Sequence, residues 1–588
     1  METSQDKQIR VDYDAGSDRF LIFCPVYGND ALSGLSSKRW LKAKRAWGAM
    51  VSRRNVEFIS KNLRDTGLAA FSEKAHVVLD EALSKLNSMG KTTGFPAGFP
   101  FKTKPIHKQK QCLDKWYGQP GFACFMDRGT GKTFTAISVA CALRMEGKIG
   151  ALLVVCKLSG RRNWEEEWLE HGVIPASFCL PRTDNKKVFE KWLFTPHDMK
   201  VMVVGVESLS AGGMAGMMDK FCMTHTNVMM IIDESHLISN HKAARSIRCI
   251  EMRNKTAYRA VLTGTPISVG PLNLFSQFEF LDPDILGTGD FYSFRNRYAV
   301  MGGYKDPRSG RPMQVIGYQN MDELAGVVAP YVFELQKSEA LDLPPKLYKK
   351  VYVELTKEQR ALYNQIKKEE SYMWAGKEVV CANVLGVALR LHQVCGGYIN
   401  TYEEVPGPGG KIKRVSETHE IMPWDKNPKI TELLDICADS GPTIIWAVYK
   451  AEITAIVDAL RETYPKAGIR EIHGGISEDD RNVAKDEFQS GECTYLVGNT
   501  ATGGSSLTLT ACETMIYYSN SQKSVDRLQS EDRAHRYGLT HSVLYIDLLA
   551  EKSIDITIMK ALAEKSDLAE YVRANISKAS KLLDGEIE

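Results

Sequence analysis

The chain has 588 residues, of which 44% are hydrophobic and 25% are charged, and its formal net charge is +3. This length exceeds what a single hydrophobic core usually serves, so we expect about three domains in an ordinary globular protein. A net charge so close to neutral does not by itself indicate a nucleic-acid partner.

Targeting and metal-binding patterns are missing from the sequence. The 13 cysteines include no C-x-x-C pair and no Cys/His group with zinc spacing, which favours a reducing compartment. Residues 1–7 lack a basic segment followed by an apolar core, and no apolar run approaches the ~20 residues of a membrane span. We therefore expect a cytoplasmic protein.

Residues 1–95 come before the first nucleotide-binding motif and are expected to form a separate unit. They contain a short apolar strand at 20–23 and an amphipathic helix that ends near Leu86. Between these elements, Trp40 and Trp47 stand among cationic residues, namely Lys38, Arg39, Lys42, Lys44, Arg45, Arg53 and Arg54. A second basic cluster consists of Lys102, Lys104, Lys108 and Lys110. Such runs suit nucleic-acid contact, and the alternative interpretation is a solvated charged face.

A glycine-rich segment at 126–133 has the pattern of a phosphate-binding loop. It follows an expected strand at 122–125 and leads into an expected helix at 134–143, which is the context such a loop requires. Lysine in this pattern reaches the β and γ phosphate oxygens, and the following threonine holds Mg²⁺. Met126 stands where the strict pattern has its first glycine. The expected phosphate-binding residues are Gly129, Thr130, Gly131, Lys132 and Thr133.

Short runs rich in Val, Ile and Leu alternate with helical stretches, which predicts two parallel sheets, each covered on both faces. The expected strands are 151–156, 201–206, 228–232 and 259–263 in the first series, then 443–446, 495–498, 515–518 and 543–546 in the second. Between the two series, residues 340–350 contain Pro344 and Pro345 and predict a hinge, followed by a helical stretch as far as Tyr372. Residues 406–410 predict a turn or loop before the second sheet begins.

Asp233 and Glu234 come directly after an expected strand of the first series. A carboxylate at the carboxyl end of a strand beside a phosphate loop can coordinate Mg²⁺, and its neighbour can orient the attacking water. We assign the first role to Asp233 and the second to Glu234, and a helix N-cap is the alternative interpretation. Residues 262–266 end the next strand with small hydroxyl side chains, which either relay the nucleotide state or form an ordinary turn.

An arginine pair, Arg533 and Arg536, lies far along the chain from the phosphate loop and is expected on one face of a helix. Guanidinium groups can stabilise the charge that develops on the γ-phosphate if two lobes close over the nucleotide. Hydrolysis would then be tied to domain movement. A solvated basic helix face is the alternative interpretation.

In this order, the motifs resemble those of superfamily 2 helicase-like ATPases of the Swi/Snf type, over about residues 100–575. The most specific matches in the first half are 156–159 with Asn163, Trp164 and Glu167, then 233–236 with Asn240, and 262–267 followed by 281–283. Those in the second half are 343–346, 472–474, Thr500 with Gly503 and Gly504, and 532–536 with Gly538. The resemblance implies an α/β fold with two RecA-like parallel-sheet lobes in tandem.

The resemblance also implies ligands for particular residues. Gln109 would help to read adenine, and Gly503 and Gln529 would join the ATP site. The lobes would grip duplex DNA and move along it by alternate closure and opening, usually without strand separation. The residues implied near the DNA backbone are Lys157, Ser159, His473, Gly474 and Thr500, and such contacts grip DNA without reading its sequence. Their alternatives are ordinary structural roles, such as a helix cap, a turn or a surface side chain.

The chain departs from the family pattern at three places. Leu539 replaces a common glutamine, Ser506 replaces an expected glycine, and residues 334–337 lack the usual adjacent arginines. These departures leave the ATP machinery intact and bear on lobe coupling and DNA contact.

The first domain has a second, fainter resemblance. Residues 20–23, 38–40 and 44–47 resemble the small accessory domain of annealing helicases, which helps those enzymes to engage branched or forked DNA. Trp40 and Trp47 could then stack on exposed bases. The alternative interpretation places both tryptophans in the core of a small domain.

We therefore expect an α+β accessory domain at 1–95, an ATP-binding lobe at 96–340 and a C-terminal lobe at 341–588. The expected function is ATP-dependent DNA translocation on duplex or forked DNA, with annealing or branch remodelling, in replication, repair or recombination. ATP and Mg²⁺ are the expected cofactors. The alternatives are a strand-separating DNA helicase or RNA-dependent ATPase, and a nucleotide-gated DNA-binding module with little turnover. Since little sequence remains beyond these parts, we expect a compact enzyme from a bacterial or phage-infected cell rather than a chromatin remodeller.

Overall fold

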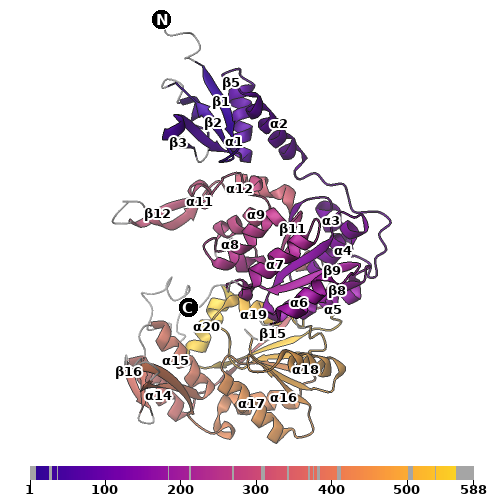
Figure 1. The fold of residues 1–588 in the computed structure, drawn as a ribbon. Coiled ribbons are helices and arrows are strands. Elements are labelled where there is room, and N and C mark those ends of the chain that lie inside the picture. Colours follow the sequence, from indigo (N-terminus) through magenta and orange to yellow (C-terminus); the bar gives the residue numbers. More distant parts are fainter. Residues whose placement is uncertain are drawn as a thin grey trace. The chain divides into compact units, whose positions relative to one another are not determined.

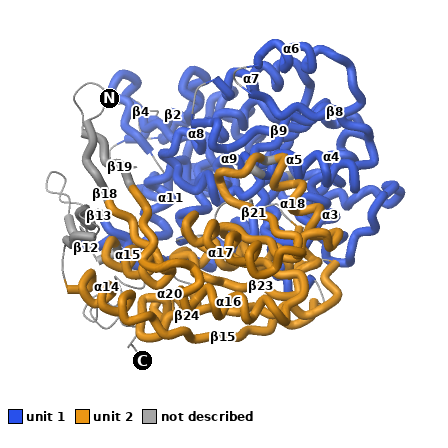
Figure 2. Tube along the Cα trace, turned by 90° about the horizontal axis from the view of Figure 1, so that it is seen from below, with its two compact units in different colours: residues 1–340 blue, residues 341–588 orange. Residues whose placement is uncertain are grey.

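The structure is a computed structural model that divides into two compact units, Met1–Ala340 and Leu341–Glu588. Figure 1 labels the elements, and Figure 2 colours the two units separately. The residues described are 8–25, 30–35, 38–182, 185–210, 213–267, 270–305, 312–340, 343–368, 371–374, 377–380, 384–406, 412–500, 508–536 and 538–564. Among them, no helix is long and apolar enough to cross a membrane.

The N-terminal part of the first unit is a small α+β domain. Its five-stranded sheet has the order β3-β4-β2-β1-β5. The bounds are β1 Ile9–Asp14, β2 Arg19–Phe23, β3 Arg39–Leu41, β4 Ala46–Met50 and β5 Ala69–Phe71, with helices α1 Arg53–Phe58 and α2 Glu73–Ser88. Phe20 and Ile22 of β2 point into its core, so the expected strand and amphipathic helix are both confirmed.

The first large sheet belongs to the same unit and is parallel throughout, in the order β14-β6-β11-β10-β7-β9-β8. Its strands are β6 Gly121–Met126, β7 Ala151–Cys156, β8 Ala176–Cys179, β9 Met199–Gly205, β10 Met229–Asp233, β11 Tyr258–Leu262 and β14 Val332–Leu335. All four expected strands of the first series are present. Their continuous apolar sequences follow from burial on both faces.

Alternate residues of these strands enter two separate cores. On one face, Leu153 and Val155 pack with α6 Lys186–Phe194, α7 Gly213–Thr224, α8 Ala244–Glu251 and α9 Leu274–Leu281. On the other face, Leu152 and Val154 pack with α3 His107–Trp116, α4 Lys132–Met145 and α5 Arg161–His171. The sheet is therefore a middle layer, and its carboxyl edge is left for loops.

The second unit contains a six-stranded parallel sheet in the order β15-β24-β23-β20-β22-β21. Its strands are β15 Leu347–Val353, β20 Thr443–Trp446, β21 Ile469–Ile472, β22 Tyr495–Gly498, β23 Thr514–Tyr517 and β24 Leu544–Ala550. The helices α16 Pro428–Ala438 and α17 Lys450–Thr463 cover one face, and α18 Glu478–Ser490 covers the other. The two expected RecA-like α/β lobes are thus present.

Two expectations for the region between the sheets were wrong, and a third, the turn at 406–410, falls largely outside the described residues. Residues 347–353 form the edge strand β15, which pairs with β24 far along the chain, so the second sheet begins before residues 406–410. The helix that follows, α14 Lys357–Lys368, ends before Tyr372, which lies in β16 Ser371–Trp374. Pro406 ends β18 Tyr398–Pro406, and residues 407–410 lie outside the described residues. The alternation in Leu347–Val353 is weak because the strand is exposed along most of its length.

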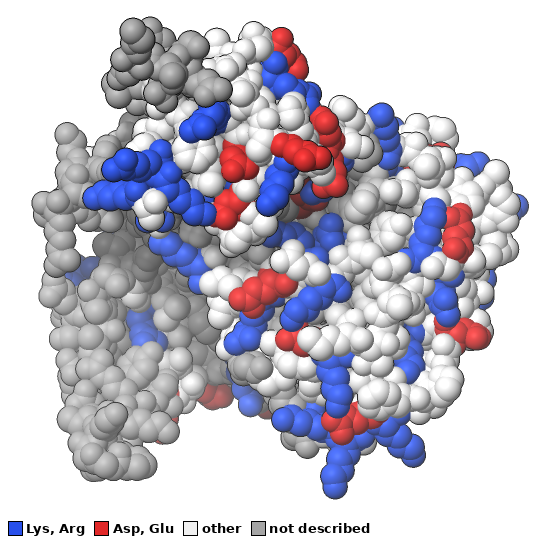
Figure 3. Space-filling view, turned by 45° about the horizontal axis from the view of Figure 1, so that its top comes forward, with Lys and Arg blue, Asp and Glu red and all other residues white. Residues whose placement is uncertain are grey.

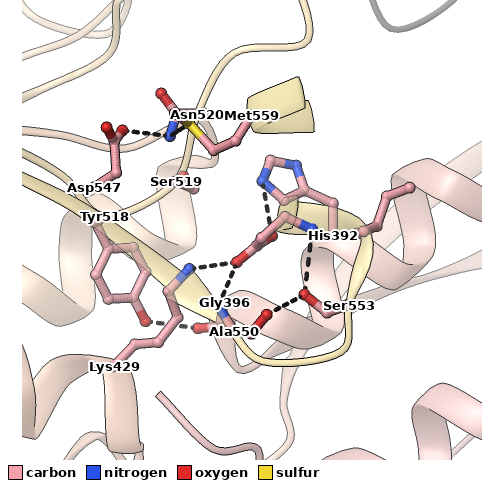
Figure 4. A network of polar contacts seen from close by, with 12 residues as sticks. His392, Gly396, Lys429, Tyr518, Ser519, Asn520, Asp547, Ala550, Ser553 and Met559 are labelled. Carbon is pink, nitrogen blue, oxygen red and sulfur yellow. Dashed lines mark hydrogen bonds and ion pairs between the residues drawn. The ribbon is translucent and has the colours of Figure 1, made fainter. Parts of the chain in front are cut away.

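A buried polar network joins elements of the second unit (Figure 4). Lys429 Nζ donates to Asp555 Oδ2 at 2.9 Å, and the backbone N–H of Ala550 donates to the same oxygen at 3.0 Å. His392 Nε2 lies 3.7 Å from Asp555 Oδ1, and burial lowers the pKa of His392 to about 4. The network ties α15 Val384–Gly396 and α16 to α20 Ile554–Ala563.

Candidate nucleotide-binding site and distant arginine pair

The candidate site of the first unit lies at the carboxyl edge of its parallel sheet. Strands β6, β11 and β10 are neighbours, so the loops after them meet at one edge. These loops are the phosphate loop at 127–131, the segment 263–266 and the carboxylate pair. Sequence reasoning assigned the motifs separately, and the strand order brings them together.

The phosphate loop depends on glycine at two positions. Gly129 has φ 76° and Gly131 has φ 92°, a left-handed conformation that other residues rarely adopt. Gln109 Nε2 donates to the carbonyl oxygen of Thr130 at 3.0 Å, and its Oε1 accepts from Ile106 N at 3.0 Å. A methyl group at Gly131 would lie 2.2 Å from Gln109 Nε2. Gln109 therefore packs on the loop from α3.

Lys132 begins α4 and points back across the loop. Its Nζ donates to the carbonyl oxygens of Met126 at 2.8 Å and Asp127 at 3.1 Å. Burial lowers the pKa of Lys132, and the nearby carboxylates of Glu234 and Asp233 oppose this effect. An ammonium group held between loop carbonyls and carboxylates is placed to move onto a phosphate oxygen.

Asp233 is the last residue of β10, and each of its carboxylate oxygens accepts one hydrogen bond. Trp164 Nε1 donates to Oδ2 at 3.2 Å, and the backbone N–H of Glu234 donates to Oδ1 at 2.9 Å. Burial and the charge of Glu234 raise the pKa of Asp233 to about 6, against the influence of Lys132. Each oxygen keeps a lone pair, and a carboxylate with the hydroxyl of Thr133 is an oxygen donor set that suits Mg²⁺.

Glu234 has φ 51°, a left-handed conformation that is uncommon for a residue with a side chain. Its Oε1 accepts from Arg128 Nε at 3.3 Å, and its Oε2 lies 3.3 Å from His236 Nδ1. Burial would raise the pKa of this carboxyl, but His236, Arg128 and Lys132 outweigh burial and hold it well below its ordinary value. Glu234 is therefore ionised beside a carboxyl whose pKa is raised. Glu234 stands at the N-cap position of the 3₁₀ helix Ser235–Ile238, but its side chain makes no cap hydrogen bond and instead contacts Arg128 and His236.

The segment after β11 contacts both neighbouring loops. A methyl group at Gly264 would lie 3.3 Å from the carbonyl oxygen of Met126, so the backbone approaches the phosphate loop closely. Thr263 Oγ1 accepts from Thr265 N at 3.0 Å and lies 3.3 Å from His236 Nδ1. The hydroxyl of Thr263 thus takes part in a turn with Thr265 and also lies near His236, which contacts Glu234.

Arg533 and Arg536 belong to the second unit, and the expectation that they share a helix face was wrong. The helix α19 Ser524–Glu531 ends before them, and residues 532–536 form a turn. The carbonyl oxygen of Arg533 accepts from Leu509 N at 3.0 Å, a long-range bond that replaces continuation of the helix. Arg533 is 3% exposed, and its guanidinium lies 5.2 Å from the ring of Trp446. Gln529 is half-buried on α19, and Gly503 lies outside the described residues.

The residues implied to contact DNA are distributed over both units. Lys157 and Ser159 follow β7, in and before the short 3₁₀ helix Leu158–Gly160. His473 and Gly474 follow β21, where His473 Nδ1 accepts from Gly475 N at 3.0 Å, so it supports a turn. Thr500 follows β22 and is 3% exposed. All of them lie after the carboxyl ends of strands in their own sheet.

The N-terminal domain separates the two tryptophans. They face each other across β3 and β4 with ring centroids 5.4 Å apart, but Trp47 packs on the core whereas Trp40 is 43% exposed. Lys38 Nζ lies 5.4 Å from the Trp47 ring. Figure 3 views the molecule from the side of this domain and shows Lys and Arg side chains gathered on its surface. The exposed members near Trp40 are Arg39, Lys42, Lys44 and Arg45.

Sequence reasoning missed Arg128 and His236 as partners of Glu234, and Glu531 as a partner of the arginine region. Arg128 and His236 stand inside recognised motifs, so their positions were the available signal. Their contacts depend on loops from different strands and on a left-handed residue, which no local pattern specifies.

Comparisons with known proteins identify two domains in this chain. A model of the SNF2-related domain matches residues 116–397, and a model of the helicase conserved C-terminal domain matches residues 425–538. The chain is 24% identical over 563 residues to "ATP-dependent DNA helicase DDM1" of Arabidopsis thaliana, covering 90% of this chain and 68% of that protein. It is 23% identical over 455 residues to "Transcription regulatory protein SNF2" of Saccharomyces cerevisiae, covering 75% and 26%. This chain thus spans only part of its relatives.

Among solved structures, the "Sulfolobus solfataricus SWI2/SNF2 ATPase core in complex with dsDNA" matches with 20% identity and a TM-score of 0.36, covering 83% of this chain and 96% of that chain. The two curated relatives are eukaryotic, so they give no support to a bacterial or phage source, which stays a prediction. Both family models and the motor motifs agree. The chain belongs to the SNF2-related family of ATP-hydrolysing, helicase-like enzymes.

Proposed function

We propose that this enzyme is an ATP-dependent DNA translocase that acts on duplex or forked DNA, with Mg²⁺ as cofactor. One observation carries the proposal. The ionised carboxylate of Glu234 lies at the sheet edge beside the phosphate loop, paired with Arg128 Nε at 3.3 Å. A buried anion next to phosphate-binding groups serves hydrolysis better than simple nucleotide binding.

The first unit performs the chemical step in this proposal. Lys132 leaves its loop carbonyls for the β and γ phosphate oxygens, and Thr133 with Asp233 would hold Mg²⁺. When bound, Mg²⁺ neutralises phosphate charge. Glu234 accepts a hydrogen bond from the attacking water, whose oxygen bonds to the γ-phosphorus while its proton is released to solvent with the phosphate product. The bond to the bridging oxygen breaks, and its electron pair leaves with ADP.

In this proposal, the second unit supplies positive charge to the γ-phosphate. Arg533 and Arg536 approach the γ-phosphate when the lobes close, and their charge stabilises the transition state. DNA bound along both lobes favours closure, so each hydrolysis cycle produces a step along the DNA. The residues proposed at the DNA backbone follow strands of both sheets, which supports a track that spans both units.

The N-terminal domain would engage branched or forked DNA through β3 and β4. Exposed Trp40 with neighbouring cations Arg39 and Lys42 combines a stacking surface with positive charge, which suits unpaired bases beside a phosphate backbone. Annealing or branch remodelling in replication, repair or recombination follows from this part of the proposal.

The first test concerns chemistry. Glu234→Gln and Lys132→Ala are each expected to lower DNA-stimulated phosphate release by at least about a hundredfold while the protein stays folded. Glu190→Gln, which changes an exposed glutamate paired with Lys220 on the same unit, serves as the matched control. Full turnover by the Glu234→Gln protein would refute the assignment.

The second test concerns the track. ATPase rates with duplex DNA, forked DNA, single-stranded DNA and RNA are compared for the wild type and for Trp40→Ala. Duplex and forked DNA are expected to stimulate most, and Trp40→Ala is expected to lose the preference for forks. Stimulation by RNA alone would support an RNA-dependent ATPase instead, and negligible turnover with every nucleic acid would support a nucleotide-gated binding module.

A further inference from the structure

Two segments of the second unit that are far apart in sequence lie against each other. Residues 343–348, which we call the leading segment, are the first described residues after the boundary between the units at Leu341. Residues 532–536, which we call the arginine loop, contain both arginines and follow α19. Glu531, the last residue of α19, contacts the leading segment directly.

Both carboxylate oxygens of Glu531 are occupied. Oε1 accepts from Arg527 Nε at 2.7 Å, one helical turn earlier. Oε2 accepts from Lys346 Nζ at 2.7 Å and from the hydroxyl of Tyr348 at 2.9 Å. The Glu531 side chain is 6% exposed, so these bonds form away from water and hold one geometry.

Charge keeps this carboxylate ionised. Burial alone would raise the pKa of Glu531, but the positive charges of Lys346 and Arg527 outweigh it and hold the pKa below its ordinary value. Arg527 has further partners, because it also donates to Asn520 Oδ1 at 2.7 Å and pairs with Asp547. If Glu531 is neutralised, Arg527 therefore keeps Asp547 as an anionic partner, whereas Lys346 loses the carboxylate that balances its charge.

The arginine loop itself is fastened to the same segment. His535 Nε2 donates to the carbonyl oxygen of Pro344 at 2.9 Å, and the backbone N–H of His535 donates to the carbonyl oxygen of Glu531 at 3.1 Å. The ring of Tyr348 stacks on Tyr545 with centroids 5.3 Å apart, and Lys346 Nζ lies 5.6 Å from that ring. The loop is thus attached at Pro344, and the residue before it is attached at Lys346 and Tyr348.

We propose that Glu531 is a positioning residue for ATP hydrolysis, which fixes the arginine loop to the leading segment. The positions of the two arginines then depend on the leading segment, which follows the first unit in the chain. This proposal rests on the role that the proposed function gives to Arg533 and Arg536. A displacement of the leading segment would move Glu531, and with it the start of the arginine loop.

The kinetic consequence is specific. The phosphate loop and Gln109 lie in the first unit, so ATP binding is expected to depend little on Glu531, although Gln529 of the same helix is also assigned to the ATP site. The arginines act on charge that develops in the transition state, so their misplacement lowers kcat and leaves KM for ATP nearly unchanged. Misplacement of a catalytic group by about 1 Å costs up to about a hundredfold in rate.

The experiment compares Glu531→Gln, Lys346→Met and Lys346→Arg in the full chain with duplex DNA. We expect Glu531→Gln and Lys346→Met to lower kcat roughly ten- to hundredfold with KM for ATP within about twofold of the wild type. Lys346→Arg keeps the charge pair and is expected to retain most of the turnover. Glu487→Gln, which changes a half-buried glutamate paired with Arg470 in the same unit, is the matched control.

A combined variant separates positioning from general damage. Arg536→Ala alone tests the proposed function, and Glu531→Gln added to a variant that already lacks both Arg533 and Arg536 is expected to cause no further loss, because both changes remove one effect. Wild-type kcat in Arg536→Ala would overturn the arginine role and this proposal with it. Reduced kcat in Arg536→Ala with wild-type kcat in Glu531→Gln would overturn only the positioning role.

Thermal unfolding guards against a purely structural explanation. If Glu531→Gln lowers Tm strongly, the comparison at Lys346 decides, because this side chain is 21% exposed and its loss disturbs packing less. Loss of turnover in Lys346→Met with recovery in Lys346→Arg supports the proposal. Equal turnover in all three Lys346 forms would overturn it.

Discussion

At the scale of single residues, the second unit contains a buried carboxyl that accepts its hydrogen bonds from uncharged groups. Glu452, on α17, is 1% exposed, and its Oε2 accepts from Ser519 Oγ at 2.6 Å, Tyr449 N at 3.1 Å and Val448 N at 3.2 Å. Burial raises the pKa of Glu452 to about 7, although these hydrogen bonds oppose the shift. The folded enzyme therefore binds a proton here that the unfolded chain releases at lower pH.

Glu452→Gln is expected to change the pH dependence of stability. A carboxyl whose folded pKa lies above its ordinary 4.5 contributes stability at low pH, and that contribution is lost as pH rises to about 7. The glutamine of Glu452→Gln does not titrate, so only the wild type loses this stability. The free energy of unfolding of the variant minus that of the wild type should therefore rise by about 3 kcal/mol between pH 4.5 and 7.5. His392 acts in the opposite direction in both proteins and cancels in the difference.

Urea unfolding of the two proteins at pH 5 and pH 8 measures this difference. Glu462→Gln, at an exposed position of the same helix, gives the effect of the substitution itself. A difference between Glu452→Gln and wild type that is the same at both pH values would contradict the argument.

At the scale of elements, two helices of the second unit begin with the same cap in different surroundings. Ser553 Oγ accepts from Asp555 N at 3.2 Å and donates to the carbonyl oxygen of Ala550 at 2.6 Å, with no exposure. Ser477 Oγ accepts from Asp480 N at 3.1 Å at an exposed position before α18. The cap of α20 thus also holds the turn from β24 (Figure 4).

Ser553→Ala is expected to cost about 2 kcal/mol of unfolding free energy, because it leaves buried backbone groups without a partner. Ser477→Ala is expected to cost about 1 kcal/mol or less, since water replaces its hydroxyl. Chemical denaturation of each variant checks the order. Equal costs would show that burial of the cap does not matter.

At the scale of the whole molecule, the two units contain separate cores. Phe278 is fully buried beneath the first large sheet, and Leu433 is fully buried against the second. Neither core cluster contains residues of the other unit. Each sheet with its helices can therefore lose its packing without direct loss of contacts in the other core.

Calorimetry is expected to resolve two unfolding transitions that respond to different substitutions. Phe278→Ala should lower one and Leu433→Ala the other, because each creates a cavity worth roughly 2–5 kcal/mol in a single core. For units of this size, the shifts should be about 3–10 °C. A single transition that both variants lower equally would show that the units unfold together.

Particular residues show how far sequence reasoning extends. The apolar runs of the first sheet predicted its strands, because a strand that is buried on both faces carries apolar residues such as Val, Ile and Leu at nearly every position. Exposed β15 was missed, because an edge strand with Leu347, Tyr348 and Tyr352 at the surface carries no such run. Arg533 and Arg536 were predicted as a pair from their spacing. The prediction that they lie on a helix was wrong, because a long-range hydrogen bond from Leu509 N to the carbonyl oxygen of Arg533 shapes the backbone there.

The sequence by itself determined the family, the two α/β lobes and the groups proposed to bind the nucleotide, because phosphate chemistry demands glycine, lysine and carboxylate at fixed local spacing. Only the tertiary structure decided the charge state of those groups. Glu234 is ionised because Arg128 and His236 reach it from other positions of the folded loops, and Asp233 has a raised pKa because it is buried beside Glu234. Glu531 likewise gained its partners Lys346 and Tyr348 only when β15 paired with β24, since contacts between distant segments leave no local pattern.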